Sequence, residues 1–265
     1  MRLRSGCFRH IVFIGKKSRS AKNGGYMEQT TRYKRVLIKL SGEALATGIT
    51  GGILNYDFVR SICLAIRECS EMGVQVALVV GAGNIWRGRQ GEKMDRTRAD
   101  HMGMLATAIN ALALQDAFVQ IGVDCRVMTA IAMHEVAEPY IRNKAVHHLD
   151  EGRTVIFGCG IGSPFFSTDT TAVLRAAAIN ADVVMMAKNI DGVYTADPRL
   201  DSSAVKLDEI SYMDILNREL KVIDSTAASF GKDNHIPLHI FVITDPYNIV
   251  RAIKGEKIGT IVTGV

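Results

Sequence analysis

The sequence predicts a single-domain α/β protein: a three-layer sandwich in which a mostly parallel central sheet has helices on both faces. Short apolar runs rich in Val and Ile alternate along the chain with longer amphipathic segments, which is typical of a parallel sheet covered by helices. The 265 residues contain no internal repeat, low-complexity segment or Pro- and Ser-rich linker. Since α/β proteins of about 250 residues commonly form one unit, we expect one domain.

The predicted strands are continuous apolar runs, because a central parallel strand is buried on both faces. They cover residues 36–40, 74–80, 125–129, 154–157, 183–186 and 238–242, and 258–263 is expected to add an edge strand. The predicted helices cover 57–71, 97–120, 170–181, 224–233 and 248–255. In the longest of them four residues recur at steps of three and four, and we interpret this stripe as core packing: Met102, Leu105, Ile109 and Leu112.

The positive charge is confined to the start of the chain. The net charge is +5, but residues 1–26 contain seven basic and no acidic residues, so the rest carries −2. A slightly acidic body gives no reason to expect a nucleic-acid partner, because binding to the phosphate backbone scales with Lys and Arg contacts. We therefore expect residues 1–32 to be a basic extension, disordered, a targeting segment or a start assigned upstream of Met27, and 33–265 to be the folded domain.

Cysteine usage and hydropathy point to the cytoplasm. The five cysteines are scattered and include no Cys-x-x-Cys pair, which favours a reducing compartment over a disulfide framework or a zinc site. We interpret each as a small buried hydrophobe: Cys7, Cys63, Cys69, Cys125 and Cys159. No continuous apolar run approaches the ~18 residues of a membrane span, so no membrane partner is expected.

Three predicted strands run directly into glycine-bearing loops, at 39–43, 81–84 and 158–164. In an open α/β sheet, ligands bind beyond the carboxyl ends of the strands. Glycine lets backbone N–H groups approach an anion, and a following helix N-terminus adds a favourable dipole. Three such loops at one sheet edge predict a site for a chain of phosphates, although each alone would also fit a plain turn.

Charged residues beside these loops strengthen that prediction. Lys39 ends an apolar strand where a lysine has no packing role, and Arg87 offers a planar fork suited to phosphate. Asp100 and Asp169 offer acceptors for ribose hydroxyls or a base. The alternatives are a solvated lysine, a surface arginine and two helix N-caps. The sequence has no P-loop, no dinucleotide-binding glycine pattern and no serine nucleophile elbow, which disfavours those enzyme classes.

Four motifs carry a resemblance to a known family. They are KLSGEAL from Lys39, GNIWRG from Gly83, DHMGMLAT from Asp100 and DGVYTADP from Asp191. In this order they resemble the bacterial uridylate kinases of the amino-acid-kinase superfamily, over residues 33–265. The resemblance implies the amino-acid-kinase fold, a homohexamer, and transfer of the ATP γ-phosphate to UMP, giving UDP and ADP for pyrimidine nucleotide biosynthesis. It also implies Mg²⁺ carried by ATP without a direct protein ligand, and GTP and UTP as effectors. We nominate Arg126 as the residue that contacts an effector.

Carried over position by position, the resemblance implies three groups of site residues. The catalytic group is Lys39, Arg87 and Asp224. The ATP-binding group is Lys39, Leu40, Ser41, Gly42, Gly83, Arg87, Lys188, Tyr194 and Asp197. The UMP-binding group is Ala82, Asp100, Ile161, Gly162, Ser163, Pro164, Phe165, Phe166, Ser167, Thr168 and Asp169. This agrees with phosphoryl transfer, which needs positioning and charge neutralisation rather than a protein nucleophile.

Ala82, Ile161 and Ser163 depart from the family pattern, in which Gly, Thr and Asn are usual. Ala82 fits a phosphate loop only if its φ stays below zero. Two other functions stay open. One is a superfamily kinase that phosphorylates a carboxylate, whose acyl phosphate would be trapped by hydroxylamine. The other is a nucleotide-binding regulator without catalysis, which would bind UMP or UTP without turnover.

Overall fold

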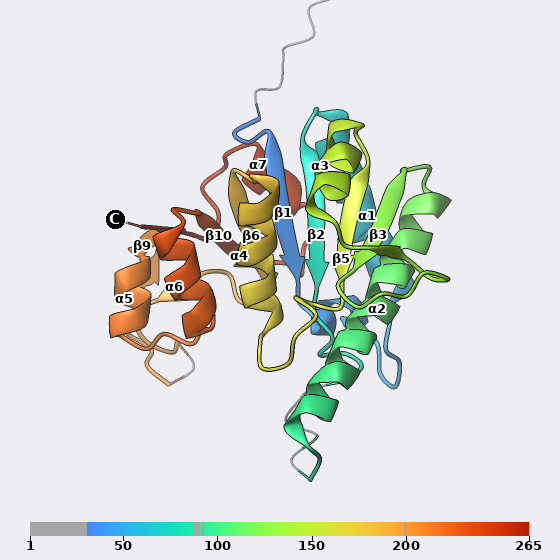
Figure 1. Ribbon diagram of the computed structural model, residues 1–265. Helices are drawn as coiled ribbons and strands as arrows, with labels where there is room; N and C mark the ends of the chain where they lie inside the picture. The colour runs from blue at the N-terminus through green and yellow to red at the C-terminus, as the bar shows by residue number, and fades with distance from the viewer. Residues whose placement is uncertain (1–30, 87–90, 92, 199, 265) are drawn as a thin grey trace, which may run out of the picture.

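The computed structural model describes residues 31–86, 91, 93–198 and 200–264, and its centre is a nine-stranded sheet (Figure 1). In spatial order the strands are β4 (Glu138–Pro139), β3 (Cys125–Thr129), β5 (Thr154–Gly158), β2 (Gln75–Val80), β1 (Arg35–Leu40), β6 (Val183–Lys188), β10 (Leu238–Val242), β11 (Thr260–Thr263) and β9 (Glu209–Ser211). A separate antiparallel pair joins β7 (Val193–Tyr194) to β8 (Lys206–Leu207).

Parallel pairing runs through the sheet except at one junction. β1 pairs in parallel with β2 and β6, while β10 and β11 are antiparallel. All six predicted central strands are confirmed, to within two residues at each end. The expected edge position of the C-terminal strand is wrong, because β9 pairs with β11 on its outer side. Sequence analysis predicted no strand at β9, whose partner follows it by some fifty residues in the chain.

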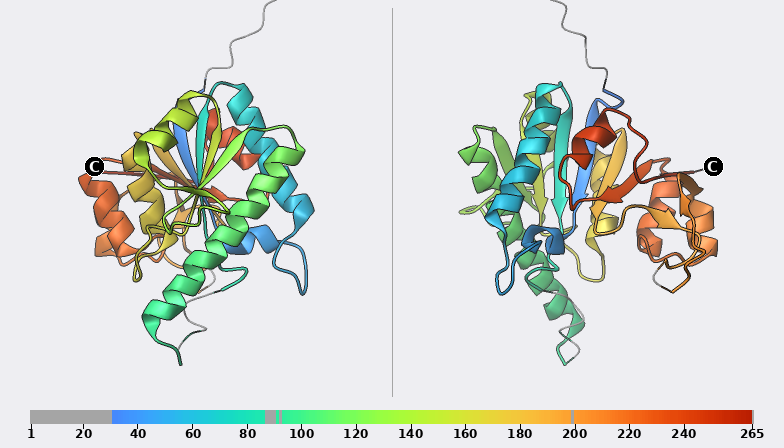
Figure 2. Two further views of the ribbon diagram at one scale, coloured as in Figure 1. Left: turned by 45° about the vertical axis from the view of Figure 1, so that its right-hand side comes forward. Right: turned by 180° about the vertical axis from the view of Figure 1, so that it is seen from behind.

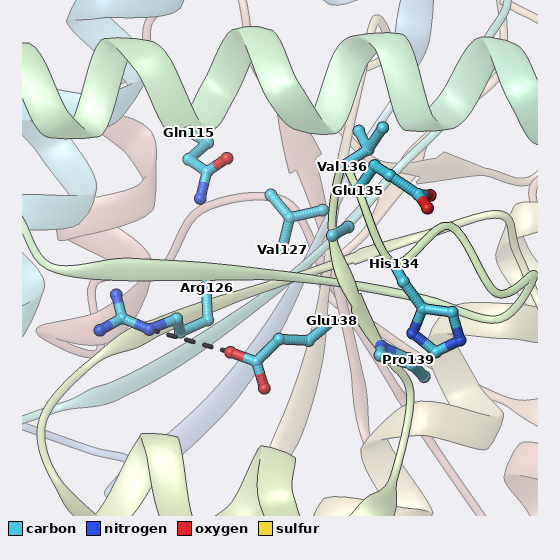
Figure 3. A pocket seen from close by; sticks show the side chains of 9 residues that line it. Gln115, Arg126, Val127, His134, Glu135, Val136, Glu138 and Pro139 are labelled. Atoms are coloured by element: carbon cyan, nitrogen blue, oxygen red, sulfur yellow. Dashed lines mark ion pairs between the residues drawn. The ribbon is translucent and has the colours of Figure 1, made fainter.

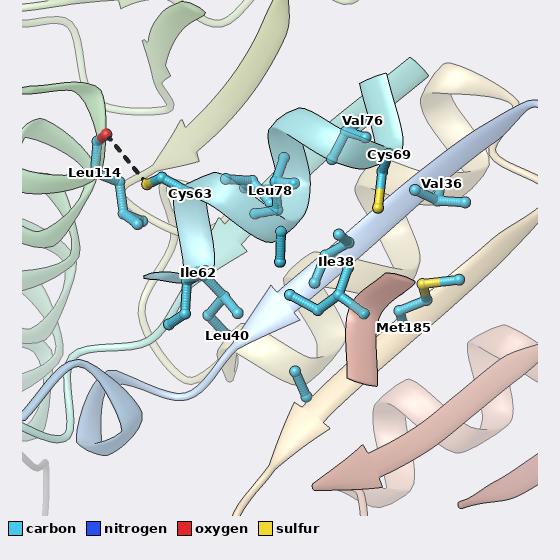
Figure 4. Packing of buried hydrophobic residues seen from close by; sticks show 14 of the residues in the cluster. Val36, Ile38, Leu40, Ile62, Cys63, Cys69, Val76, Leu78, Leu114 and Met185 are labelled. Carbon is cyan, nitrogen blue, oxygen red and sulfur yellow. Dashed lines mark hydrogen bonds between the residues drawn. The ribbon is translucent and has the colours of Figure 1, made fainter. Parts of the chain in front are cut away.

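Helices cover both faces of the sheet, as expected (Figure 2). One face packs against α1 (Tyr56–Glu71), α2 (Arg96–Gln120) and α7 (Asn248–Ile253). The other packs against α3 (Arg142–Asp150), α4 (Thr168–Ile179), α5 (Tyr212–Asn217) and α6 (Ser225–Asp233). Because side chains alternate along a strand, Val36, Ile38 and Leu40 of β1 point to the α1 face, where Figure 4 shows them packed, and Leu37 points to the other.

Side-chain caps set the starts of the two helices at the candidate site. Asp95 caps α2 by accepting the Arg98 N–H at 3.1 Å, and Ser167 caps α4 by accepting the Asp169 and Thr170 N–H groups. The alternative interpretation of Asp100 and Asp169 as N-caps is therefore wrong. Both aspartates lie inside their helices, so their carboxylates do not serve as the N-caps.

The apolar stripe on α2 is not core packing, and that interpretation is wrong. Met102, Leu105 and Ile109 are 39%, 48% and 47% exposed, while Leu114 and Phe118 of the same helix are buried on the sheet. A 25-residue helix is about 37 Å long and a six-residue strand about 20 Å, so one end of α2 extends past the sheet (Figure 1). Among the described helices, α2 alone is long and apolar enough to span a membrane, by length and composition only.

Candidate active site

The carboxyl ends of the parallel strands meet at one edge of the sheet, at the bottom of Figure 1. The loops after β1, β2 and β5 leave the sheet there, as predicted from their glycines. Leu40 ends β1 with its side chain fully buried, and the next residue, Ser41, caps a short 3-10 helix, η1 (Gly42–Ala46), by accepting the Ala44 N–H. At this edge Leu40 therefore contributes only its backbone, and the Ser41 side chain serves as a helix cap.

The first two glycine loops pack directly on each other. The Gly81 N–H donates to the Leu40 carbonyl at 2.9 Å, and a Cβ on Gly42 would collide with the backbone nitrogen of Gly83. Any side chain at Gly42 would thus separate the two loops. Ala82, between Gly81 and Gly83 of the second loop, is not among the described residues with positive φ, so its Cβ is accommodated without backbone strain.

A pair of amide side chains holds the second loop in place. Asn110, fully buried on α2, donates to the Gly81 carbonyl at 2.7 Å and to the Asn84 Oδ1 at 2.8 Å. Asn84 in turn donates to the Ile53 carbonyl at 2.5 Å. Buried, mutually satisfied amides rigidify their surroundings, and here they fix the loop against α2. Sequence analysis missed Asn110, since its neighbours give no polar signal.

Two lysines converge on one carboxylate at this edge. Lys39 Nζ lies 2.7 Å from Asp169 Oδ1 and Lys188 Nζ lies 2.9 Å from Asp169 Oδ2. Lys39 is 7% exposed, so the alternative of a solvated lysine is wrong. Burial raises the pKa of Asp169, but the two ammonium groups outweigh it and bring that pKa to about 2. Burial also lowers the pKa of Lys188. The Lys39, Lys188 and Asp169 side chains together carry one net positive charge.

Asp224 joins this cluster from the start of α6. Its Oδ1 accepts the Ala227 N–H at 2.9 Å as the helix cap, and the hydroxyls of Ser167 and Thr170 donate to its carboxylate. Lys188 Nζ also donates to the Val222 carbonyl, two residues before Asp224. The structure therefore brings together Lys39, Lys188, Asp169 and Asp224, which lie far apart in the sequence.

Beside the lysine cluster lies a cavity of about 130 Å³. Half of its lining comes from predicted UMP-binding residues: Ala82, Asp100, Ile161, Ser163, Phe166 and Thr168. The other six are Ala99, Gly103, Met104, Thr107, Gly160 and Thr171, which sequence analysis missed although Gly103, Met104 and Thr107 lie in a quoted motif. Five predicted UMP-binding residues do not line this cavity: Gly162, Pro164, Phe165, Ser167 and Asp169. Two of these make other contacts, since Ser167 caps α4 and Asp169 pairs with the lysines.

Asp100 ties the tip of the third loop to α2. Its carboxylate accepts the Phe165 N–H at 2.8 Å and both its oxygens lie 2.9 Å from Arg96 Nε, one turn earlier on α2. Phe165 has φ of 72° and its ring is 67% exposed, with the Arg96 guanidinium 5.6 Å from the ring centroid. Asp100 thus lines the cavity while it holds the loop that closes it.

The remaining predicted nucleotide residues lie elsewhere or outside the described part of the chain. Tyr194 is on β7, and its hydroxyl donates to Asp191 at 2.9 Å rather than to the lysine cluster. Asp197 follows on the same segment, and its carbonyl accepts the Leu200 and Asp201 N–H groups. Arg87 lies outside the described residues.

Arg126 lines a second cavity, of about 350 Å³, beside β3 and β4 (Figure 3). Its guanidinium pairs with Asp124, and its Nε lies 3.9 Å from Glu138 Oε1 across the cavity wall. His134, Glu135 and Gln115 complete the polar lining. None of the residues of this cavity lines the first one, so Arg126 belongs to a separate site.

Comparisons with known proteins agree with this geometry. Residues 34–242 match the amino acid kinase family. A solved UMP kinase from Bacillus anthracis is 42% identical, with a TM-score of 0.85, over 88% of this chain and 96% of that one. A UMP kinase from Ureaplasma parvum is 34% identical, with a TM-score of 0.83, over 88% and 99%. A uridylate kinase from Archaeoglobus fulgidus is 31% identical, with a TM-score of 0.67, over 86% and 99%.

The family match spans residues 34–242, a range that contains the four motifs, the three glycine loops and the lysine cluster. Together with the solved structures it confirms the resemblance to the uridylate kinases that the motifs indicated. The chain belongs to the amino acid kinase family.

Proposed function

We propose that this protein is a UMP kinase, which transfers the γ-phosphoryl group of ATP to UMP and gives UDP and ADP in pyrimidine nucleotide metabolism. One observation carries the proposal: the Lys39–Asp169–Lys188 cluster and the paired glycine loops lie at the same sheet edge as the cavity that Asp100 and Thr168 line. Similarity to three solved UMP or uridylate kinases supports it. A cytoplasmic location is expected, because the scattered cysteines favour a reducing compartment.

The chain's own groups act by position and charge. In the proposed reaction, Lys39 and Lys188 would neutralise the charge of the transferred phosphoryl group, and the closely packed Gly42 and Gly83 loops would offer backbone N–H groups to the phosphates. Asp169, ionised because of its low pKa, holds both ammonium groups in register. The attacking atom is a phosphate oxygen of UMP, so no protein nucleophile is needed. Preorganised cations in a water-poor site stabilise the transition state without reorganisation.

Mg²⁺ fits this site as an ion carried by ATP. The edge carboxylates, Asp169 and Asp224, already accept from two ammonium groups, two hydroxyls and a backbone N–H, whereas Mg²⁺ in such enzymes is bound largely by substrate phosphates and water. When bound, the ion supplies charge neutralisation on the β- and γ-phosphates. The same lysines and glycine loops would hold the metal-bound nucleotide.

A coupled assay for nucleoside diphosphate tests the proposal. ATP and Mg²⁺ are supplied with UMP, CMP or dCMP as acceptor, and hydroxylamine is added in parallel to trap any acyl phosphate. Turnover with UMP and no trapped acyl phosphate is expected. A folded protein that binds UMP or UTP but turns over none of the acceptors would instead support the regulator, and a hydroxamate product would support the carboxylate kinase.

We also propose that the protein assembles as a homohexamer through α2, whose Met102, Leu105 and Ile109 form an exposed apolar stripe. Leu105→Asp is expected to shift the species seen in sedimentation velocity at micromolar concentration toward smaller assemblies, because a carboxylate cannot be buried unpaired in an apolar contact. Met213→Asp is the matched control, since Met213 is similarly exposed, at 44%, on α5. A wild-type monomer, or identical sedimentation of all three proteins, would contradict the proposal.

The cavity around Arg126 is our proposed site for GTP and UTP as effectors. It offers a guanidinium for phosphate, and Gln115 and Glu138 for a base or ribose. Arg126→Gln is expected to abolish any change in rate caused by added GTP or UTP while the rate without effector stays within about twofold, because Arg126 lies outside the first cavity. Arg153→Gln, which removes another guanidinium from the same Asp124 carboxylate, is the control. An effector response that survives Arg126→Gln would rule out this site.

A further inference from the structure

Arg175, on α4, is a buried cation to which phosphoryl transfer assigns no role. It is 6% exposed, and no described carboxylate forms an ion pair with it. Its guanidinium carbon lies 3.5 Å from the centroid of the Tyr140 ring and 5.8 Å from that of Phe157, and those two rings meet edge to face. An unpaired buried charge is costly, and burial lowers the pKa of Arg175. An apolar side chain would fill this space at a lower cost.

Arg175 donates a hydrogen bond to the wall of the cavity that Asp100 and Thr168 line, which is the proposed site of the phosphate acceptor and is called the acceptor cavity below. Its Nη2 donates to the Gly160 carbonyl at 3.2 Å, and Gly160 lines the cavity, as does Thr171 one turn earlier on α4. Arg175 therefore lies directly behind the cavity wall, with its planar guanidinium stacked on Tyr140 and one edge turned to the loop.

The loop at this point has a backbone conformation that needs support. Cys159 and Gly160 both have left-handed φ, of 61° and 58°, and for a residue with a side chain this costs about 1–3 kcal/mol. Besides the Gly162 N–H, which donates to the Cys159 carbonyl at 3.0 Å, two side chains oppose the relaxation of this turn: the Cys159 N–H donates to Thr107 Oγ1 at 2.8 Å, and Arg175 holds the next carbonyl. Arg175 is the charged, and so the stronger, of these two contacts.

We propose that Arg175 is a positioning residue for the phosphate acceptor: by holding the Gly160 carbonyl, it sets the course of loop 159–166 and thus the shape of the acceptor cavity. This rests on the proposed function, since UMP is the acceptor. The role predicts that acceptor binding and protein stability respond differently to substitution. Loss of the guanidinium releases the loop, but it also removes an unpaired buried charge, so thermal stability changes little.

The test compares Arg175→Met and Arg175→Lys with wild type, with Arg142→Met as the control. Arg142 also donates from its guanidinium to a backbone carbonyl of α4, that of Ala178 at 2.8 Å, but lies on α3 away from the cavity. Arg175→Met is expected to raise KM for UMP about tenfold, the loss of one charged hydrogen bond, with KM for ATP within about twofold. Arg175→Lys can still donate to Gly160, so its KM for UMP is expected to stay close to that of wild type. Arg142→Met is expected to leave both KM values unchanged.

Hydrogen exchange of the free proteins gives a readout independent of activity. Faster exchange is expected in 159–166 for Arg175→Met, with 35–46 unchanged. If Arg175→Met does not fold, Arg175→Lys and Tyr140→Leu, which removes the ring beneath the guanidinium, provide the same comparison. Equal rises in both KM values, or unchanged KM for UMP and unchanged exchange in 159–166, would overturn the inference. A wild-type protein without UMP turnover overturns the proposed function instead, and the exchange data then still decide whether Arg175 holds the loop.

Discussion

Replacement of Lys39 by alanine is expected to lower kcat for UDP formation by at least about 10²-fold, the loss typical when one preorganised charge is removed from a transition state. The reason is the setting of this ammonium group. Lys39 is 7% exposed at the end of β1, and its Nζ lies 2.7 Å from Asp169. Water cannot replace a fixed charge in so enclosed a place. The coupled assay for nucleoside diphosphate, at saturating ATP and UMP, measures the change.

Lys34→Ala is the matched control for this substitution, because Lys34 is an exposed lysine just before the other end of the same strand. Its kcat is expected to stay within about twofold of wild type, since exposed charges contribute little at a distance. A loss of less than about fivefold in Lys39→Ala would remove Lys39 from the catalytic group.

Replacement of Asp169 by asparagine is expected to destabilise the fold as well as abolish turnover. The substitution keeps the shape of the side chain but removes the carboxylate charge that pairs with both Lys39 Nζ and Lys188 Nζ. Breaking a buried ion pair by removing one partner typically costs about 3–5 kcal/mol, because the remaining charge is left uncompensated. Two lysines remain here, and the pKa of Lys188 is already lowered by burial. Urea unfolding at pH 7 measures the free energy.

The pH dependence of that loss has a definite sign. The pKa of Asp169 is about 2 in the folded protein, against an ordinary value of 3.8, so its contribution to stability is fully present above about pH 4 and is lost as pH falls through 2. The stability gap between wild type and Asp169→Asn should therefore narrow in acid. Asp150→Asn, which breaks the exposed pair with Arg35 at 2.7 Å, is the control and should cost about 1 kcal/mol or less. A gap that is the same at pH 6 and pH 2.5 would contradict this account.

The strands were predictable because central parallel strands are buried on both faces and so appear as unbroken apolar runs, as in β1 and β10. The elements that sequence analysis missed have no such signal. α3 buries only Ala145 and Leu149 of its nine residues, and β4 and β7 are two-residue pairings defined by their neighbours. The apolar stripe on α2 could be recognised in the sequence, but its exposure could not be predicted, because periodicity alone does not show how far a helix extends beyond the sheet.

By itself, the sequence determined the fold class, from its apolar strands, and the likeness to the uridylate kinases, from four motifs. It also predicted a nucleotide site, from glycines at strand ends and a lysine without a packing role. Only the tertiary structure decided how these parts meet. Asp169 pairs with Lys39 from 130 residues away, and Arg175 reaches Gly160 through the core from another element. Local propensity and periodicity act over a few residues, whereas burial and charge pairing depend on which segments the sheet brings together, and those contacts have no local pattern to record them.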